Sequence, residues 1–228
     1  MTTLPVKIRS TVEAQEALER DIAPRRQELF NLKGALGASS VKEFVRKSAL
    51  LLAFAHIEGA MKAGLTILFL RMNHSGLAWR DVPTRLAHFE IDWRLARIGT
   101  ARRVISDDAT TAWLRNLPDQ PIAIDVGGLI GRVGVINAET LRRILSICEF
   151  EPRRYNEALE SLDEALIARR HDLAHGSQVP VDPGLAIAAI DLALTLIESL
   201  LIDFSNLLTR QSWRGTARGR REISPSQS

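Results

Sequence analysis

SALLLAFAHIEGAMKAGLTILFL, residues 48–70, is an apolar stretch long enough to form a core helix or to cross a membrane. Three groups that can carry charge, His56, Glu58 and Lys62, lie near its middle. Each ionised group would cost roughly 2.5–3.5 kcal/mol at the centre of a bilayer. The stretch therefore predicts a buried helix of a helical bundle, in which Glu58 and Lys62 are spaced to pair on one helix face.

A second apolar stretch, LAIAAIDLALTLIESLLIDFSNLL (185–208), predicts the last long helix. It carries Asp191, Glu198 and Asp203, so it too is expected inside a bundle and not in a membrane. Asp191, Glu198 and Ser205 recur every seven residues and leave a narrow polar stripe on an otherwise apolar helix. Such a stripe is typical of a helix that is buried on most sides.

The rest of the chain predicts an all-α bundle of about five or six helices with a less regular middle. Apolar residues at helical spacing predict a first helix over 11–36. Pro24 should kink or split that helix, because an interior proline removes a hydrogen bond and clashes with the preceding turn. Asn137 is placed to cap a later helix. The stretch 121–136, PIAIDVGGLIGRVGVI, mixes β-branched residues with four glycines and predicts a small β-hairpin or an irregular crossover.

Composition and the first residues indicate an intracellular protein. The chain has 228 residues, of which 46% are hydrophobic and 25% are charged, as in a folded soluble protein. Cys148 is the single cysteine, which excludes a disulfide within the chain. The opening MTTLPVKIRSTVEAQEALERD lacks the apolar core of a signal peptide. We therefore expect a cytoplasmic protein.

The basic charge of the chain is concentrated at its C-terminal end. Residues 210–228 hold five arginines and one acid, Glu222, a net charge of +4, so residues 1–209 carry −1 of the total of +3. These features predict a helical domain over 1–212 and a basic, disordered tail over 213–228. The tail is either a solvated end or an accessory arm that holds an anionic polymer by its charge.

The stretch RRHDLAHGS, residues 169–177, concentrates titratable groups at the end of a predicted helix. Histidine takes up or releases a proton near neutral pH, and the arginine fork matches two phosphate oxygens. These groups suffice for cleavage of an RNA phosphodiester, because the ribose 2′-OH is itself the nucleophile. Arg170 and His175 lie about 140° apart on an ideal helix, so the helix changes between them or a second chain completes the site.

Two other interpretations of the same stretch remain open. His171 and His175 share a helix face at the spacing of a zinc site, with Asp172 where a zinc protease has its general base. Asp172 reaches less far than glutamate, and no obvious third ligand follows. Alternatively, the cations only complement the dipole at a helix C-terminus.

ARRHDLAHG resembles the signature of the HEPN superfamily (higher eukaryotes and prokaryotes nucleotide-binding domains). That signature is an arginine, a polar residue, three variable positions and a histidine, commonly followed by glycine. Arg170, His171, His175 and Gly176 occupy these positions here. PRRQELFNLKGAL and LLLAFAHIEGAMK also resemble the opening helices of small bacterial HEPN proteins. The resemblance implies a HEPN-type bundle over about residues 12–210.

The resemblance implies a dimeric, metal-independent endoribonuclease without a cofactor. His175 would serve as the general base or acid, Arg170 would hold the scissile phosphate, and His171 would orient the site or contact the phosphate. Arg169, Asp172 and Glu58 are the expected substrate contacts, although Glu58 could equally serve only to pair with Lys62 or a motif arginine. The alternative is a HEPN module that binds RNA, a nucleotide or a partner protein without turnover.

The resemblance also suggests a biological role, a toxin or an anti-phage effector with an antitoxin or defence partner. In HEPN toxins paired with a nucleotidyltransferase, a tyrosine usually follows the motif histidine by two positions and is modified to silence the toxin. Ser177 stands there in this chain, and Tyr155 is its single tyrosine. Inhibition by a partner protein or activation upon phage infection is at least as plausible here.

Overall fold

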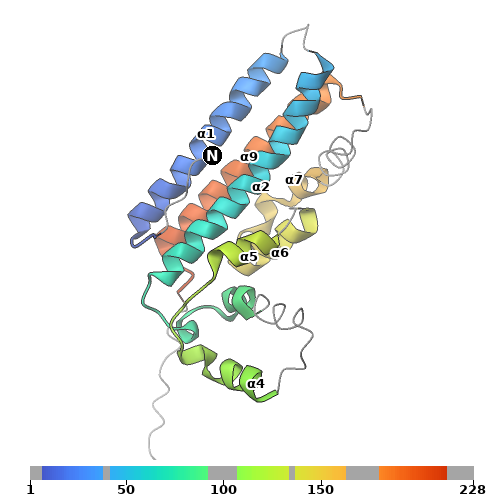
Figure 1. Ribbon diagram of the computed structural model, residues 1–228. Helices are drawn as coiled ribbons and strands as arrows, with labels where there is room; N and C mark the ends of the chain where they lie inside the picture. The colour runs from blue at the N-terminus through green and yellow to red at the C-terminus, as the bar shows by residue number, and fades with distance from the viewer. Residues whose placement is uncertain (1–6, 38–41, 92–106, 134–136, 163–179, 215–228) are drawn as a thin grey trace, which may run out of the picture.

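The computed structural model describes residues 7–37, 42–91, 107–133, 137–162 and 180–214, and the named elements in these ranges are all helices (Figure 1). Three long helices form the bundle: α1 (Thr11–Leu36), α2 (Glu43–Asn73) and α9 (Pro183–Arg210). α1 runs antiparallel to both of the others. The shorter elements are η1 (Trp79–Asp81), a helical segment over 84–91, α4 (Asp107–Asn116), η2 (Leu117–Asp119), α5 (Val126–Val133), α6 (Ala138–Cys148), η3 (Pro152–Arg154) and α7 (Asn156–Ser161).

The contact between α2 and α9 forms the centre of the core. A β-carbon added at Gly64 of α2 would lie 2.3 Å from Cε2 of Phe204 of α9, so the missing side chain lets the two helices approach closely. Among the described residues these are the two helices long and apolar enough to cross a membrane, a test that core helices also pass. Both supply much of the buried core, which confirms the prediction that they are core helices.

Ion pairs fix the register of α1 on α9. Arg26 Nε lies 3.0 Å from Glu198 Oε1, and Lys33 Nζ lies 2.5 Å from Asp191 Oδ1. Lys33 follows Arg26 by seven residues in α1, and its partner Asp191 precedes Glu198 by seven residues in α9, as expected for antiparallel helices. All four side chains are partly exposed, so each pair adds roughly 0–1 kcal/mol of stability at most. Asp191 and Glu198 of the polar stripe predicted on the last helix thus pair with α1.

Pro24 does not split the first helix. α1 runs without interruption from Thr11 to Leu36 and holds Pro24 in its interior, so of the two predicted outcomes the split into two helices is wrong, and the kink stays a prediction. An interior proline costs about 3 kcal/mol. The turns on either side of it are held by the buried side chains of Ile22 and Leu29, whose packing offsets that cost.

The middle of the chain is more regular than predicted. Residues 126–133 form helix α5, so the small β-hairpin over 121–136 is wrong. Among the described residues β-pairing is confined to one isolated bridge, between Ala78 and Pro121. The apolar residues of α5 line one face of a helix and pack on the core through Leu129. Helical periodicity therefore outweighs the low helix propensity of glycine and valine.

Two predictions made from local signals are confirmed, and one boundary moves. Asn137 caps α6 by accepting from the Thr140 backbone N–H at 2.7 Å. The long helix after residue 182 is α9. Trp213, which the predicted boundary assigned to the tail, is completely buried.

The close approach at Gly64 predicts opposite effects of the same substitution at two helical glycines. Gly64→Ala should lower the free energy of unfolding by about 1–3 kcal/mol, because the new methyl group overlaps the Phe204 ring. At Gly34, exposed in α1, a β-carbon meets nothing within 4 Å. Gly34→Ala should raise stability by roughly 0.5–1 kcal/mol. Urea unfolding measures both, and equal effects would contradict the contact.

Candidate functional site

The predicted catalytic segment lies between two described flanks. Arg169, Arg170, His171, Asp172 and His175 fall in 163–179, outside the described residues, so their geometry stays a prediction. Before them the chain passes through η3 and α7, and after them it enters α9.

A buried hydrogen-bond network anchors the flank that precedes this segment. Arg154 Nη1 donates to Asp203 Oδ1 at 2.6 Å, and the Tyr155 hydroxyl donates to Asp203 Oδ2 at 2.9 Å. Asp203 belongs to α9 and is 7% exposed. Burial, and after it the Asp203 carboxylate, raise the pKa of Tyr155, so its hydroxyl keeps the proton that it donates. The network fixes the start of α7 on the side of α9.

The flank that follows the segment is anchored as firmly. Val181 is buried at 1% exposure, which returns the chain to the core. Asp182 then caps α9, because its Oδ1 accepts from the Leu185 backbone N–H at 2.9 Å. Leu162, the last residue described before the predicted catalytic segment, is also completely buried. Both ends of the predicted catalytic segment are therefore attached to the core that contains α9.

Glu58 is the one predicted site residue that the structure describes. Its Oε1 accepts from Lys62 Nζ at 2.6 Å, one turn further along α2, which confirms the predicted pairing. The two side chains are 22% and 27% exposed. Glu58 thus has a structural partner on its own helix, while a contact with substrate stays a prediction.

A second polar cluster, between α1 and α2, was missed at the level of sequence. Arg25 of α1 binds Asp21 through two nitrogens, Nε at 2.7 Å and Nη2 at 3.1 Å. The same guanidinium crosses Gly59, where an added β-carbon would lie 2.1 Å from Nη1. The signal was present in PRRQELF and HIEG, the segments that carried the resemblance. Which residues meet across two helices does not follow from spacing within one helix.

His56 completes this cluster as a neutral group. It is 9% exposed, and its Nε2 lies 3.2 Å from Glu28 Oε2 without hydrogen-bond geometry. Burial lowers the pKa of His56, and Arg25 lowers it further, against the opposing effect of Glu28. His56 is therefore uncharged at neutral pH. Its place in the α1–α2 contact favours a role in packing.

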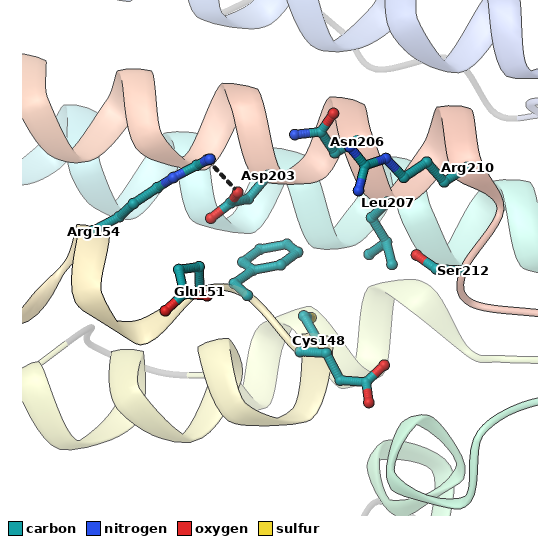
Figure 2. Close-up of a pocket in the computed structure, with 10 residues that line it drawn as sticks. Cys148, Glu151, Arg154, Asp203, Asn206, Leu207, Arg210 and Ser212 are labelled. Carbon is teal, nitrogen blue, oxygen red and sulfur yellow. Dashed lines mark hydrogen bonds and ion pairs between the residues drawn. The ribbon is translucent and has the colours of Figure 1, made fainter.

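A pocket of about 430 Å³ lies between the α6–η3 connection and the last turns of α9 (Figure 2). The Arg154–Asp203 ion pair forms part of its wall, and Arg210 and Asn206 stand on the α9 side. Phe150 meets Phe204 edge to face, with ring centroids 4.9 Å apart. The pocket is large enough for a small polar ligand. It contains none of the predicted site residues that the structure describes.

Comparison with known protein families places most of the chain in a family. The family model described as RiboL-PSP-HEPN matches residues 20–206. This range includes α2 with Glu58, the stretch RRHDLAHGS and nearly all of α9. No curated protein and no solved structure matched the chain.

The anchoring network predicts an unusual alkaline titration. Tyr155 is the single tyrosine, so the tyrosinate absorbance band reports it alone. Its folded-state pKa lies above the unfolded value of about 10. Its contribution to stability is therefore complete below pH ~10 and is lost as the pH rises above that value. We expect tyrosinate to appear only together with loss of helical circular dichroism.

In denaturant the same band should rise near pH ~10, which serves as the control. A band that rises near pH ~10 in the folded protein would show that Tyr155 is accessible and would contradict the network.

Proposed function

This chain belongs to the RiboL-PSP-HEPN family, and from that membership we propose that it is a metal-independent endoribonuclease that acts as a toxin or an anti-phage effector. The observation that carries the proposal is a family match that spans the motif in RRHDLAHGS and the helices on both sides of it. HEPN modules are generally nucleases or RNA-binding modules. An arginine and a histidine at the motif positions favour the nuclease.

The proposed reaction uses the ribose 2′-OH as nucleophile. The 2′-oxygen attacks the adjacent phosphorus, the bond to the 5′-oxygen of the next nucleotide breaks, and the products are a 2′,3′-cyclic phosphate and a 5′-OH end. His175 takes the 2′-OH proton or delivers one to the leaving oxygen. Arg170 holds the phosphate and stabilises its charge. No metal ion and no cofactor enter this scheme.

Other motif residues would complete the site in a dimer. His171 would orient the site or contact the phosphate, and Arg169 and Asp172 would contact substrate. Arg170 and His175 point about 140° apart on one ideal helix, which favours a site shared between two copies of the chain. Glu58 would join the site only if it left its pairing with Lys62.

Control by a partner protein, or by phage infection, fits the described residues better than control by tyrosine modification. Ser177 occupies the position of the tyrosine that is modified in some HEPN toxins. Tyr155, the single tyrosine, is completely buried and donates to Asp203. A modifying enzyme would reach it only after local unfolding. We therefore propose an inhibitory partner protein or an infection trigger.

A cleavage assay in excess EDTA tests the proposed reaction. The wild-type protein should cut RNA in chelator, and His175→Ala should slow cleavage by about 10²–10⁴-fold, as expected for loss of a general acid or base. The products should carry 2′,3′-cyclic phosphate and 5′-OH ends. Arg20→Met, a change of an exposed side chain on α1, is the matched control for the fold, because it leaves the motif and the Glu58–Lys62 pair unchanged.

Other results would replace this function with a named alternative. Loss of cleavage in chelator would indicate a metal-dependent hydrolase that uses His171 and His175 with Asp172. RNA binding without cleavage of any RNA would indicate a non-catalytic HEPN module for RNA, a nucleotide or a partner protein.

The basic tail should add a salt-dependent contribution to RNA binding. Residues 215–228 contain three arginines. Each phosphate contact with single-stranded RNA contributes roughly 0.7 to the slope of log affinity against log salt concentration. Deletion of these residues should therefore reduce the magnitude of that slope by up to about 2. Fluorescence anisotropy over a range of salt concentrations measures that slope. An unchanged slope would assign the tail to a solvated end.

A further inference from the structure

α2 and α9 end at the same end of the bundle (Figure 1). A cluster of hydrogen-bond donors lies there. It consists of Arg71, in the last turn of α2, with Trp213 and Arg214, which follow α9. Arg71 is 7% exposed and Trp213 is completely buried, whereas Arg214 is exposed. We call these three residues the donor cluster.

The buried donors of this cluster have no acceptor among the described residues. Nε and Nη1 of Arg71 and Nε1 of Trp213 are enclosed and make no hydrogen bond. A buried donor left without a partner costs about 1–3 kcal/mol, and more when it is charged. Native structures rarely keep such groups together without a ligand or an ion to satisfy them.

The charges in the cluster are also unbalanced. The guanidinium carbons of Arg71 and Arg214 lie 5.6 Å and 5.2 Å from the centroid of the Trp213 ring, so both cations contact one indole. Burial lowers the pKa of Arg71, and the charge of Arg214 lowers it further. Glu13 provides an opposing charge, but in the described residues no carboxylate lies within ion-pair distance of either arginine.

We propose that the donor cluster of Arg71, Trp213 and Arg214 is a binding site for a phosphate group, which the RNA backbone supplies. Phosphate oxygens only accept hydrogen bonds and carry negative charge, so one such group would satisfy orphaned donors and relieve the repulsion between the arginines. Arg214 is exposed and can turn away from the ring without unpacking the bundle. The choice of RNA as the source rests on the proposed function.

The site would hold RNA far from the point where the chain leaves the predicted catalytic segment. α9 has 28 residues, and a rise of 1.5 Å per residue separates its ends by about 42 Å. The cluster lies beyond its C-terminal end, and the predicted catalytic segment precedes its N-terminal end. The donor cluster would therefore fix the path of a long RNA and leave short substrates unaffected.

Thermal unfolding in phosphate and in chloride, at matched ionic strength, tests the anion site without any nuclease activity. The Tm of the wild-type protein should be higher in phosphate. Arg71→Met keeps an unbranched apolar stem in place of the side chain and removes the buried unpaired charge, so its Tm in chloride should not fall below that of the wild type. Its Tm should rise less in phosphate than that of the wild type, because only the general stabilising effect of phosphate on folded proteins remains. Arg20→Met removes one positive charge, as Arg71→Met does, but from an exposed side chain, so it should keep the wild-type response.

Binding of a 2′-deoxy oligonucleotide tests whether the phosphate comes from nucleic acid, since a strand without 2′-OH groups cannot be cleaved by the proposed reaction. Arg71→Met and Arg214→Gln should each weaken binding and reduce the salt slope by about 0.7, while Arg20→Met should not. Arg214→Gln changes an exposed side chain, so it gives a result even where Arg71→Met does not fold.

Each outcome separates the two proposals. An equal response to phosphate in Arg71→Met and wild type, or an equal loss of binding in Arg20→Met, would overturn the site. A reduced phosphate response with unchanged oligonucleotide binding would keep the site and assign it to a free phosphate compound. A wild-type protein that cleaves no RNA but shows both effects would contradict the nuclease and leave the donor cluster standing.

Discussion

The contact of Phe204 with the backbone of α2 at Gly64 is the constraint on which the positions of the other elements depend. It sets the separation of the two core helices. The same ring meets Phe150 edge to face, and the neighbouring residue, Asp203, binds Arg154 and Tyr155. One short stretch of α9 therefore positions α2, the α6–η3 connection and the start of α7. α7 is the last helix described before the HEPN motif, so the core fixes the described flank that precedes the motif.

The sequence predicted those elements whose signals are local. Helix 11–36 follows from apolar spacing, α6 from the cap at Asn137, and α9 from its apolar run with a polar stripe. The middle was harder, because the glycines and β-branched residues of 121–136 favour neither helix nor strand on their own. Burial of Leu129 against the core decides for a helix there, and that contact is not visible in the sequence. The continuity of α1 through Pro24 likewise depends on packing, through the buried side chains of Ile22 and Leu29.

In the candidate site, too, local contacts were predictable from the sequence and long-range contacts were not. The Glu58–Lys62 pair was predictable because its partners are one helical turn apart. The contacts between Arg25 and Gly59, and between Arg71 and Trp213, join residues distant in the chain, and composition gives no sign of them. Motif residues such as Arg170 and His175 were found by their order in the sequence, which carries the family signature but not its geometry. Local order thus predicted the chemistry of the motif, and tertiary packing decided which described residues are neighbours.

The contact of the Arg25 guanidinium with Gly59 also has an evolutionary consequence. A side chain at position 59 would displace the guanidinium from its place beside Asp21, and a shorter residue at position 25 would leave a hollow beside the glycine. Neither change is neutral alone, although the two together could be. Positions 25 and 59 should therefore vary jointly among relatives that keep this pair of helices, so that the Glu-Gly sequence of α2 is inherited together with an arginine of α1.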